Sequence, residues 1–311
     1  MTLRLTAIIV LFALPAGAES GRTAAPFLQR PMGAQAAAMG TAFTAVQDRA
    51  DSLQYNPAAA GTLTKKTFTS SYMKGLGGAT HGYFVYAHPT ALATFSASLL
   101  YFNAGRIYLN LSDGTQTTVT AEENTAYALS CGRHLTGGLH VGATYRFIQL
   151  ELAETARATT SQTDFGFLWR APWKGFSIGG AYQFLGPDIT YESAGDPSPR
   201  TLRYGAAFRF PDIDPAKIDP SVDLQEFDLT VTLDNVHVLH EKITPRAGLE
   251  IGLTPPSAGR IALRSGWIFN RETEGLTFGV GFRQGIVGLD YAFGSNSAMG
   301  SLQHFTLSIV F

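Results

Sequence analysis

The sequence has little cysteine, little charge and no long apolar run beyond its N-terminal segment. A single cysteine, Cys131, excludes a disulfide framework within the chain. Charged residues make up 15% of the chain, against about a quarter in typical domains, and the net charge is -1. No basic cluster exceeds Lys65-Lys66, so the sequence predicts no nucleic-acid partner. No later stretch reaches the ~18 uninterrupted apolar residues of a membrane-crossing helix.

The N-terminal segment, residues 1–18, has the pattern of a secretory signal peptide. Arg4 supplies the positive start, Leu5 to Leu14 form the apolar run, and Ala16-Gly17-Ala18 gives the cleavage site. The apolar run is too short to span a bilayer as a helix. We therefore predict cleavage after Ala18 and export of the remaining chain.

Glycine and phenylalanine are abundant, with 33 and 21 copies, and apolar and polar residues alternate with period two. The alternation is nearly unbroken from Arg203 onward, as in Leu276 to Arg283, and an earlier strand runs from Phe176 to Phe184. A soluble sandwich and a membrane barrel both satisfy such one-sided patterning. The stretches run ~9–13 residues, long enough to cross a bilayer when tilted, whereas sandwich strands average ~5–6.

The end of the chain also favours the barrel. Phe305 and Phe311 lie on one face of the last strand, and a terminal aromatic resembles the assembly signal of outer-membrane barrels. We predict an all-β fold over residues 65–311, a single transmembrane antiparallel β-barrel of about fourteen strands in a bacterial outer membrane. Outer-membrane lipid and the barrel-assembly machinery are then partners. Strand parity makes residues 104–121 and 187–199 external loops and leaves the long 211–224 connection unexplained.

A small, weakly charged segment precedes the strands, within residues 19–64. Residues 48–55 could form two helical turns with Asp48 as N-cap, and Pro57 ends the helix at Asn56. This segment resembles the N-terminal signature of the PorV/PorQ outer-membrane proteins, relatives of the FadL-type channels. The matching residues include Met39, Gly40, Phe43, Asp48, Asn56, Pro57 and Ala58. The resemblance, repeated at residues 244–250 and 276–293, implies a plug inside the barrel.

Charged residues on the polar faces of the predicted strands converge on the lumen, where interior charges generally pair. These charged residues could serve only to pair with one another and with the plug, or they could line a polar passage or a docking surface for a partner. Both interpretations rest on the same residues, so the sequence leaves both open. The predicted lumen network comprises Arg203, Arg209, Asp228, Arg246, Glu250, Arg264, Arg283 and Asp290. This set is charged and glycine-rich rather than apolar, which disfavours an apolar ligand pocket in the lumen.

Motifs that carry chemistry are weak. Gly175 to Gly179 spells G-x-S-x-G, but it lies inside a strand, whereas a nucleophile elbow needs a strand-to-helix turn. His237 and His240, three residues apart, point to opposite faces of a strand, which disfavours a metal site. Cys131 is expected on the lipid-facing side as an inert apolar residue. The sequence predicts no catalytic residues, no metal and no cofactor.

The function is therefore predicted to be non-enzymatic. The PorV/PorQ resemblance implies a role in protein export or surface attachment of the type IX secretion kind, through recognition of secreted cargo or secretion-machinery proteins. The alternative is a FadL-like channel for hydrophobic small molecules, which requires an apolar pocket near the plug.

Overall fold

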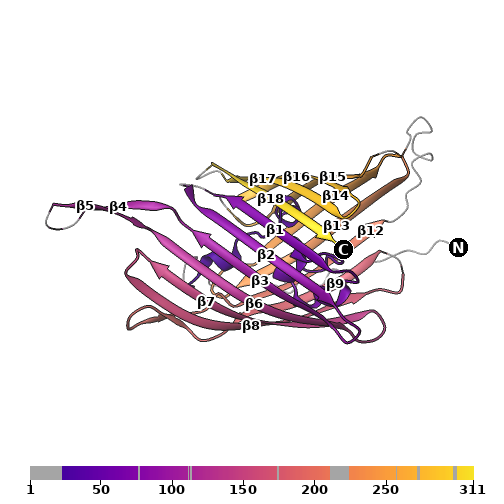
Figure 1. Cartoon of the computed structure of the whole chain (residues 1–311). Helices are drawn as coiled ribbons and strands as arrows, with labels where there is room; N and C mark the ends of the chain where they lie inside the picture. Colours follow the sequence, from indigo (N-terminus) through magenta and orange to yellow (C-terminus); the bar gives the residue numbers. More distant parts are fainter. Residues whose placement is uncertain are drawn as a thin grey trace.

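A computed structural model describes residues 23–75, 78–110, 112, 114–173, 175–210, 224–256, 258–271, 274–296 and 300–311. Within these residues, fourteen strands close into an antiparallel barrel, in the order β1-β18-β17-β16-β15-β14-β13-β12-β9-β8-β7-β6-β3-β2 (Figure 1). The fold class predicted from the alternation is confirmed. The predicted signal peptide and most of the 211–224 connection lie outside the described residues.

The barrel strands have the following bounds: β1 Thr67–Lys74, β2 Thr80–Pro89, β3 Thr94–Asn103, β6 Glu122–His134, β7 Leu139–Leu152, β8 Ala156–Arg170, β9 Phe176–Leu185, β12 Thr201–Phe210, β13 Glu226–Val238, β14 Thr244–Thr254, β15 Arg260–Ile268, β16 Glu274–Gln284, β17 Val287–Asn296 and β18 Gly300–Val310. Outside the barrel, β4 (Arg106–Asn110) pairs with β5 (Gln116–Thr120), and β10 (Ile189–Thr190) with β11 (Gly195–Asp196).

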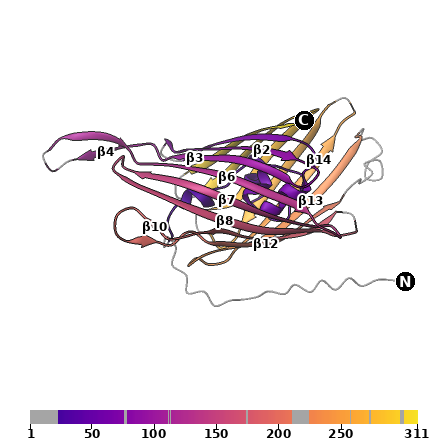
Figure 2. The same ribbon diagram turned by 60° about the horizontal axis from the view of Figure 1, so that its bottom comes forward.

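The two ends of the barrel differ. The β4–β5 hairpin projects far beyond the strands at one end, and the C-terminus lies at the other (Figure 1). The β10 loop lies at the same end as the hairpin (Figure 2). We call this end the hairpin rim and the opposite end, with its short turns and the C-terminus, the turn rim. The two connections predicted to be long and external share the hairpin rim.

The N-terminal segment lies inside the barrel as a plug of short helices. These are η1 (Pro26–Gln29), α1 (Ala34–Ala38), η2 (Asp51–Gln54) and η3 (Pro57–Thr62). The predicted helix over residues 48–55 is wrong in extent and in its cap. Asp48 adopts a φ of 60°, which is incompatible with the extended backbone of an N-cap, so η2 begins only after Ala50.

Strand β9 departs from the predicted alternation at its end. Phe176 to Phe184 read as one continuous face, but Gln183 and Phe184 both lie opposite Asp164, which forms a β-bulge. Phe184 has a φ of 59°, and its backbone N–H donates to Asp164 Oδ1 at 2.8 Å. The bulge turns the Phe184 ring into the lumen, where it is 1% exposed.

The outer wall is covered with exposed apolar side chains. Every second residue of the strands contributes, and the set includes Tyr72, Phe84, Tyr127, Tyr145, Phe165, Leu233, Leu263, Phe278, Leu289 and Phe305. Cys131 is exposed on this wall, the face on which the sequence places it. Among the described residues, no helix combines the length and apolar composition that a membrane crossing requires.

Candidate functional site

A belt of wall glycines receives the plug. Gly132, Gly142 and Gly166 are paired in register across β6, β7 and β8, and Gly248 faces Gly266 across β14 and β15. A Cβ at Gly132 would lie 2.7 Å from Ala60 Cβ, and one at Gly248 would lie 2.7 Å from Met39 Cβ. Both separations are shorter than any carbon–carbon contact allows, so only glycine lets the plug backbone approach the wall this closely. With these five, the glycine belt includes Gly179 and Gly279.

Polar wall side chains anchor the plug backbone across the barrel. One Asp234 oxygen, Oδ2, accepts hydrogen bonds from the backbone N–H of Phe43 and of Thr44, both at 2.8 Å, and from Thr44 Oγ1 at 2.6 Å. Thr277 Oγ1 accepts from Gly40 N at 3.1 Å and donates to Ala38 O at 2.9 Å. These bonds satisfy backbone N–H and C=O groups of the plug that form no hydrogen bond within a regular helix.

Asn56 joins the two halves of the plug to the wall. Its Nδ2 donates to Thr44 O and to Phe167 O, both at 2.9 Å, and its Oδ1 accepts from Ala58 N at 3.0 Å. The last bond is the N-cap of η3, and Pro57 follows at the first helical position. The Asn-Pro-Ala motif therefore has a local structural reason.

The apolar plug residues form a small core of their own. Met39, Phe43, Tyr55 and Ala36 pack together, with Val46 against them. The Tyr55 hydroxyl donates to Met32 O and accepts from Met32 N, both at 2.8 Å. Burial raises the pKa of Tyr55, so the phenol keeps the proton that it donates.

Part of the predicted lumen network forms a connected set of ion pairs between the wall and the plug. Arg264 binds Glu250 at 2.5 Å and Asp290 at 2.7 Å, while Arg260 binds Glu250 and Asp228, both at 2.9 Å. Arg209 reaches Asp228 at 3.3 Å. The plug enters the network through two side chains, Gln35, which donates to Glu250, and Arg49, which binds Asp51 and Asp290.

The other predicted lumen residues are not in that set. Arg203 donates to Gln183 Oε1 at 2.8 Å and lies over the Tyr55 ring, 5.3 Å from its centroid. Arg246 is buried on β14, in register with Asp234. Arg283 has no ion pair among the described residues. Asp48, a plug-motif residue, faces Arg170 at 3.4 Å at the turn rim.

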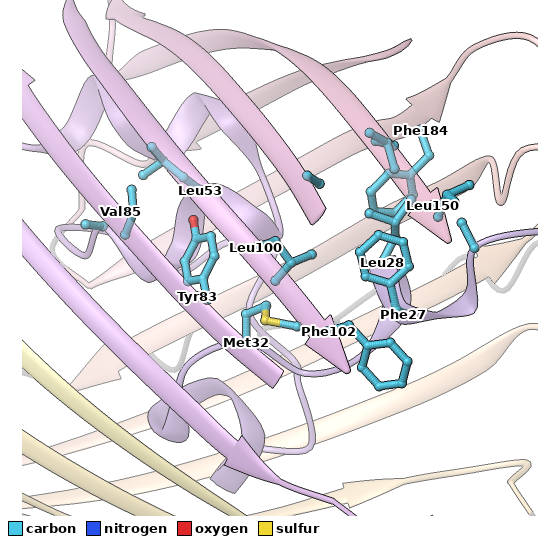
Figure 3. Packing of buried hydrophobic residues seen from close by; sticks show 14 of the residues in the cluster. Phe27, Leu28, Met32, Leu53, Tyr83, Val85, Leu100, Phe102, Leu150 and Phe184 are labelled. Carbon is cyan, nitrogen blue, oxygen red and sulfur yellow. The ribbon is translucent and has the colours of Figure 1, made fainter. Parts of the chain in front are cut away.

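The charged and glycine-rich character inferred for the lumen does not extend along its whole length. An inner apolar cluster fills the lumen toward the hairpin rim (Figure 3). Its wall members include Tyr83, Val85, Leu100, Phe102, Ile148, Leu150 and Phe184, and its plug members include Phe27, Leu28, Met32 and Leu53. Ile189 of the β10 loop also belongs to the cluster. The charged residues in the prediction come from later strands, whereas β2, β3, β6 and β7 turn apolar side chains inward.

Phe27 occupies an aromatic slot within this cluster. Its ring lies 6.1 Å from the Phe102 ring at an interplanar angle of 25°, and 6.4 Å from His81. Arg30 also lies over the Phe102 ring, with its guanidinium carbon 4.8 Å from the Phe102 centroid. Phe27 itself is 1% exposed. The slot therefore accepts one flat aromatic ring, which the chain itself supplies.

The G-x-S-x-G sequence, which is typical of hydrolases, has a structural role here. Ser177 of the G-x-S-x-G sequence lies in β9 and donates to Ala45 O at 2.9 Å, so it holds the plug. Within the described residues, no three His, Cys, Asp or Glu side chains converge as a metal site.

Sequence reasoning missed several residues that organise the lumen. Thr277, Arg49 and the glycine belt act through plug contacts between residues far apart in the chain, which alternation does not reveal. Asp234, by contrast, was predictable as a lumen-facing acidic residue of β13 that pairs with the plug, although Phe43 and Thr44 could not be named as its partners.

The fold and these contacts define a closed, plugged β-barrel with a lumen divided into a charged and an apolar region. No family profile matches the sequence, and no curated protein matches it. Among solved structures, the toluene transporter TodX of Pseudomonas putida is similar over 90% of this chain and 97% of its own, with a TM-score of 0.56 and 12% identity. The monoaromatic hydrocarbon channel CymD is similar over the same shares, with a TM-score of 0.55 and 10% identity.

A FadL homologue from Pseudomonas aeruginosa matches over 89% of this chain and 97% of its own, at 9% identity and a TM-score of 0.48. At such identities, the likeness to TodX and CymD shows a common fold. The finer PorV/PorQ resemblance stays a prediction.

Proposed function

We propose that this barrel spans a bacterial outer membrane and takes up small hydrophobic molecules. The apolar outer wall is what a lipid-facing surface requires, because charged groups there would be costly at mid-bilayer. The observation that carries the uptake function is the aromatic slot held by Phe27. TodX and CymD, which share the fold, are described as a toluene transporter and a monoaromatic hydrocarbon channel.

The ligand would bind in the inner apolar cluster by taking the place of Phe27. Apolar side chains surround the slot. An uncharged ring or hydrocarbon chain that moves from water into the slot is therefore stabilised by the same burial of apolar surface that now stabilises Phe27 there. The plug closes the lumen on the side of the turn rim, so passage requires the N-terminal segment to move. Uptake of a ligand is therefore coupled to displacement of this segment.

Replacing Phe27 with alanine tests this proposal. Burial of a phenylalanine side chain contributes about 1.5–3 kcal/mol, so its loss should favour the displaced segment and tighten binding of an apolar probe by about 10-fold or more. Binding is measured as fluorescence of N-phenyl-1-naphthylamine with the purified barrel in detergent.

Phe43→Ala is the matched control, because Phe43 is also fully buried in the plug but lies outside the inner apolar cluster. It should leave probe affinity unchanged in the folded barrel. Equal affinities of wild type and Phe27→Ala, or an equal gain in both variants, would contradict the proposed binding site.

Assembly into the membrane gives a further prediction. Phe311 is 61% exposed on the outer wall, and its backbone N–H donates to Lys66 O at 2.8 Å, beside the seam between β1 and β18. Phe311→Asp should sharply reduce the heat-modifiable barrel in outer-membrane fractions, because the assembly machinery is expected to recognise the terminal aromatic. Phe269→Asp, at the opposite rim, controls for loss of an exposed phenylalanine. Normal accumulation of Phe311→Asp would refute this role.

A second candidate function is recognition of exported proteins, as the PorV/PorQ resemblance implies. The supporting observation is the projecting β4–β5 hairpin, on which Tyr108 is 77% exposed and Ile107 is 41% exposed. Exposed aromatics on a two-stranded ribbon are suited to protein contact. This function needs no displacement of Phe27, so it predicts no change in probe affinity for Phe27→Ala.

A further inference from the structure

A cavity of about 610 Å³ lies between the plug and the wall toward the turn rim. Its floor is formed by plug residues such as Val46 and Arg49, and its sides by the ends of β12, β15 and β16. Within the described residues, six arginines and three carboxylates line it, namely Arg49, Arg170, Arg209, Arg260, Arg264 and Arg283, with Asp48, Glu250 and Asp290. The volume is that of a small-molecule site.

Two of the three lining carboxylates are held in ion pairs of the lumen network, and the third, Asp48, faces Arg170 at 3.4 Å. Glu250 is held by Arg264 and Arg260, and Asp290 by Arg264 and Arg49. These pairs are largely buried, with the Arg264 side chain 2% exposed. Asp51 and Asp228 also bind lining arginines, Asp51 to Arg49 and Asp228 to Arg209 and Arg260, so five carboxylates face the six arginines. The remaining positive charge lies on the arginines at the edge of the network.

Arg283 is the arginine of the lining that is most available to a ligand. It lies in register with Arg260 on the neighbouring strand, and like charges directly opposite one another are destabilising. On its other side stands Gly288, which offers no side chain. Among the described residues, Arg283 forms no ion pair, although its side chain is partly buried and lines the cavity.

Arg209 adds a second available guanidinium. Its side chain is 57% exposed, and its contact with Asp228 is 3.3 Å, longer than the 2.9 Å contact of Arg260 with the same carboxylate. Guanidinium groups bind carboxylate and phosphate oxygens through paired N–H donors. An anion between the arginines would also relieve the repulsion between Arg260 and Arg283.

We propose that this cavity is a binding site for a small soluble oxyanion, a phosphate or a dicarboxylate, with Arg283 as its principal ligand. The cavity is bounded by the plug and the wall, which fits a small molecule. The site is separate from the aromatic slot, and the proposal does not depend on uptake of hydrophobic molecules.

Titration calorimetry of the purified full-length barrel in detergent tests the site, with inorganic phosphate and succinate as probes at constant ionic strength. Arg283→Gln, which keeps hydrogen-bonding capacity but loses the charge, should weaken binding by about 10-fold or more, since a charge-assisted hydrogen bond contributes at least that ratio. Arg157→Gln is the matched control, because Arg157 forms an exposed pair with Glu151 at the hairpin rim.

The proposal is supported if either probe binds wild type, binds Arg283→Gln more weakly and binds Arg157→Gln unchanged. Binding of phosphate but not succinate identifies a phosphoryl ligand, and binding of succinate but not phosphate identifies a carboxylate ligand. Absence of binding to wild type, or equal binding to Arg283→Gln, overturns it. If the variant does not fold, the proposal is tested by a measurement on wild type alone. Phosphate or succinate should raise the melting temperature above that in chloride of equal ionic strength, and equal melting temperatures would also overturn the proposal.

Discussion

Asp234→Ala is expected to release the plug from the wall. The variant removes the acceptor of two backbone N–H groups and one hydroxyl, all buried, and each unsatisfied group costs about 1–3 kcal/mol. We expect a loss of about 3–5 kcal/mol in the free energy that holds the plug. Limited proteolysis followed by mass spectrometry measures this loss as new cleavage between residues 33 and 61.

Two variants make the result specific. Asp234→Asn keeps an oxygen in the same place and should protect the plug partly, while Asp188→Ala removes an exposed carboxylate of the hairpin rim and should change nothing. A plug as resistant to protease in Asp234→Ala as in wild type would show that the glycine belt and the other hydrogen bonds suffice without this anchor.

Arg264→Met is expected to destabilise the whole barrel. The substitution fits the space but leaves Glu250 and Asp290 without their shared cation, in surroundings where the Arg264 side chain was 2% exposed. Breaking a buried ion pair from one side costs about 3–5 kcal/mol, because a charge is left uncompensated. Denaturant unfolding in detergent measures the change in the free energy of unfolding.

The double variant Arg264→Met/Asp290→Asn separates charge from packing. It restores the charge balance, so it should be more stable than the single variant although it carries one more substitution. Arg157→Met, which breaks an exposed pair with Glu151, should cost less than about 1 kcal/mol. A single variant no less stable than Arg157→Met would contradict the central role of Arg264.

Strand positions could be predicted because each strand has one face toward lipid and one toward the lumen, so alternation is visible in a single sequence. Leu276 to Arg283 shows it, and β16 lies there. The rule fails at Phe184, where a bulge inserts one residue and moves the ring to the lumen. Nothing in the local sequence marks that bulge, since Asp164, which fixes the Phe184 backbone, lies twenty residues earlier.

The contents of the lumen were harder to predict than its wall. The sequence places a helix end at Asn56 because Pro57 follows it, and η2 ends close by at Gln54, but the helix η3 that Asn56 caps was not predicted. Phe27 and Leu28 follow no strand period, because they belong to the plug, and the packing of Phe27 on Phe102 joins residues about 75 positions apart. The apolar character of the lumen toward the hairpin rim was missed for this reason and because the predicted lumen residues came only from later strands, whereas β2, β3, β6 and β7 turn apolar side chains inward.

The glycine belt also constrains the order in which the barrel can form. The plug precedes β1 in the chain, and the seam that closes the barrel pairs β1 with β18, which follows every other barrel strand of the described residues. Once this seam is closed, the belt leaves no clearance for the plug to thread past the wall, because Ala60 and Met39 already lie at contact distance from its backbone. The plug must therefore settle against β6–β9 and β14–β16 while the cylinder is still an open sheet, and it acts as the template around which that sheet curls.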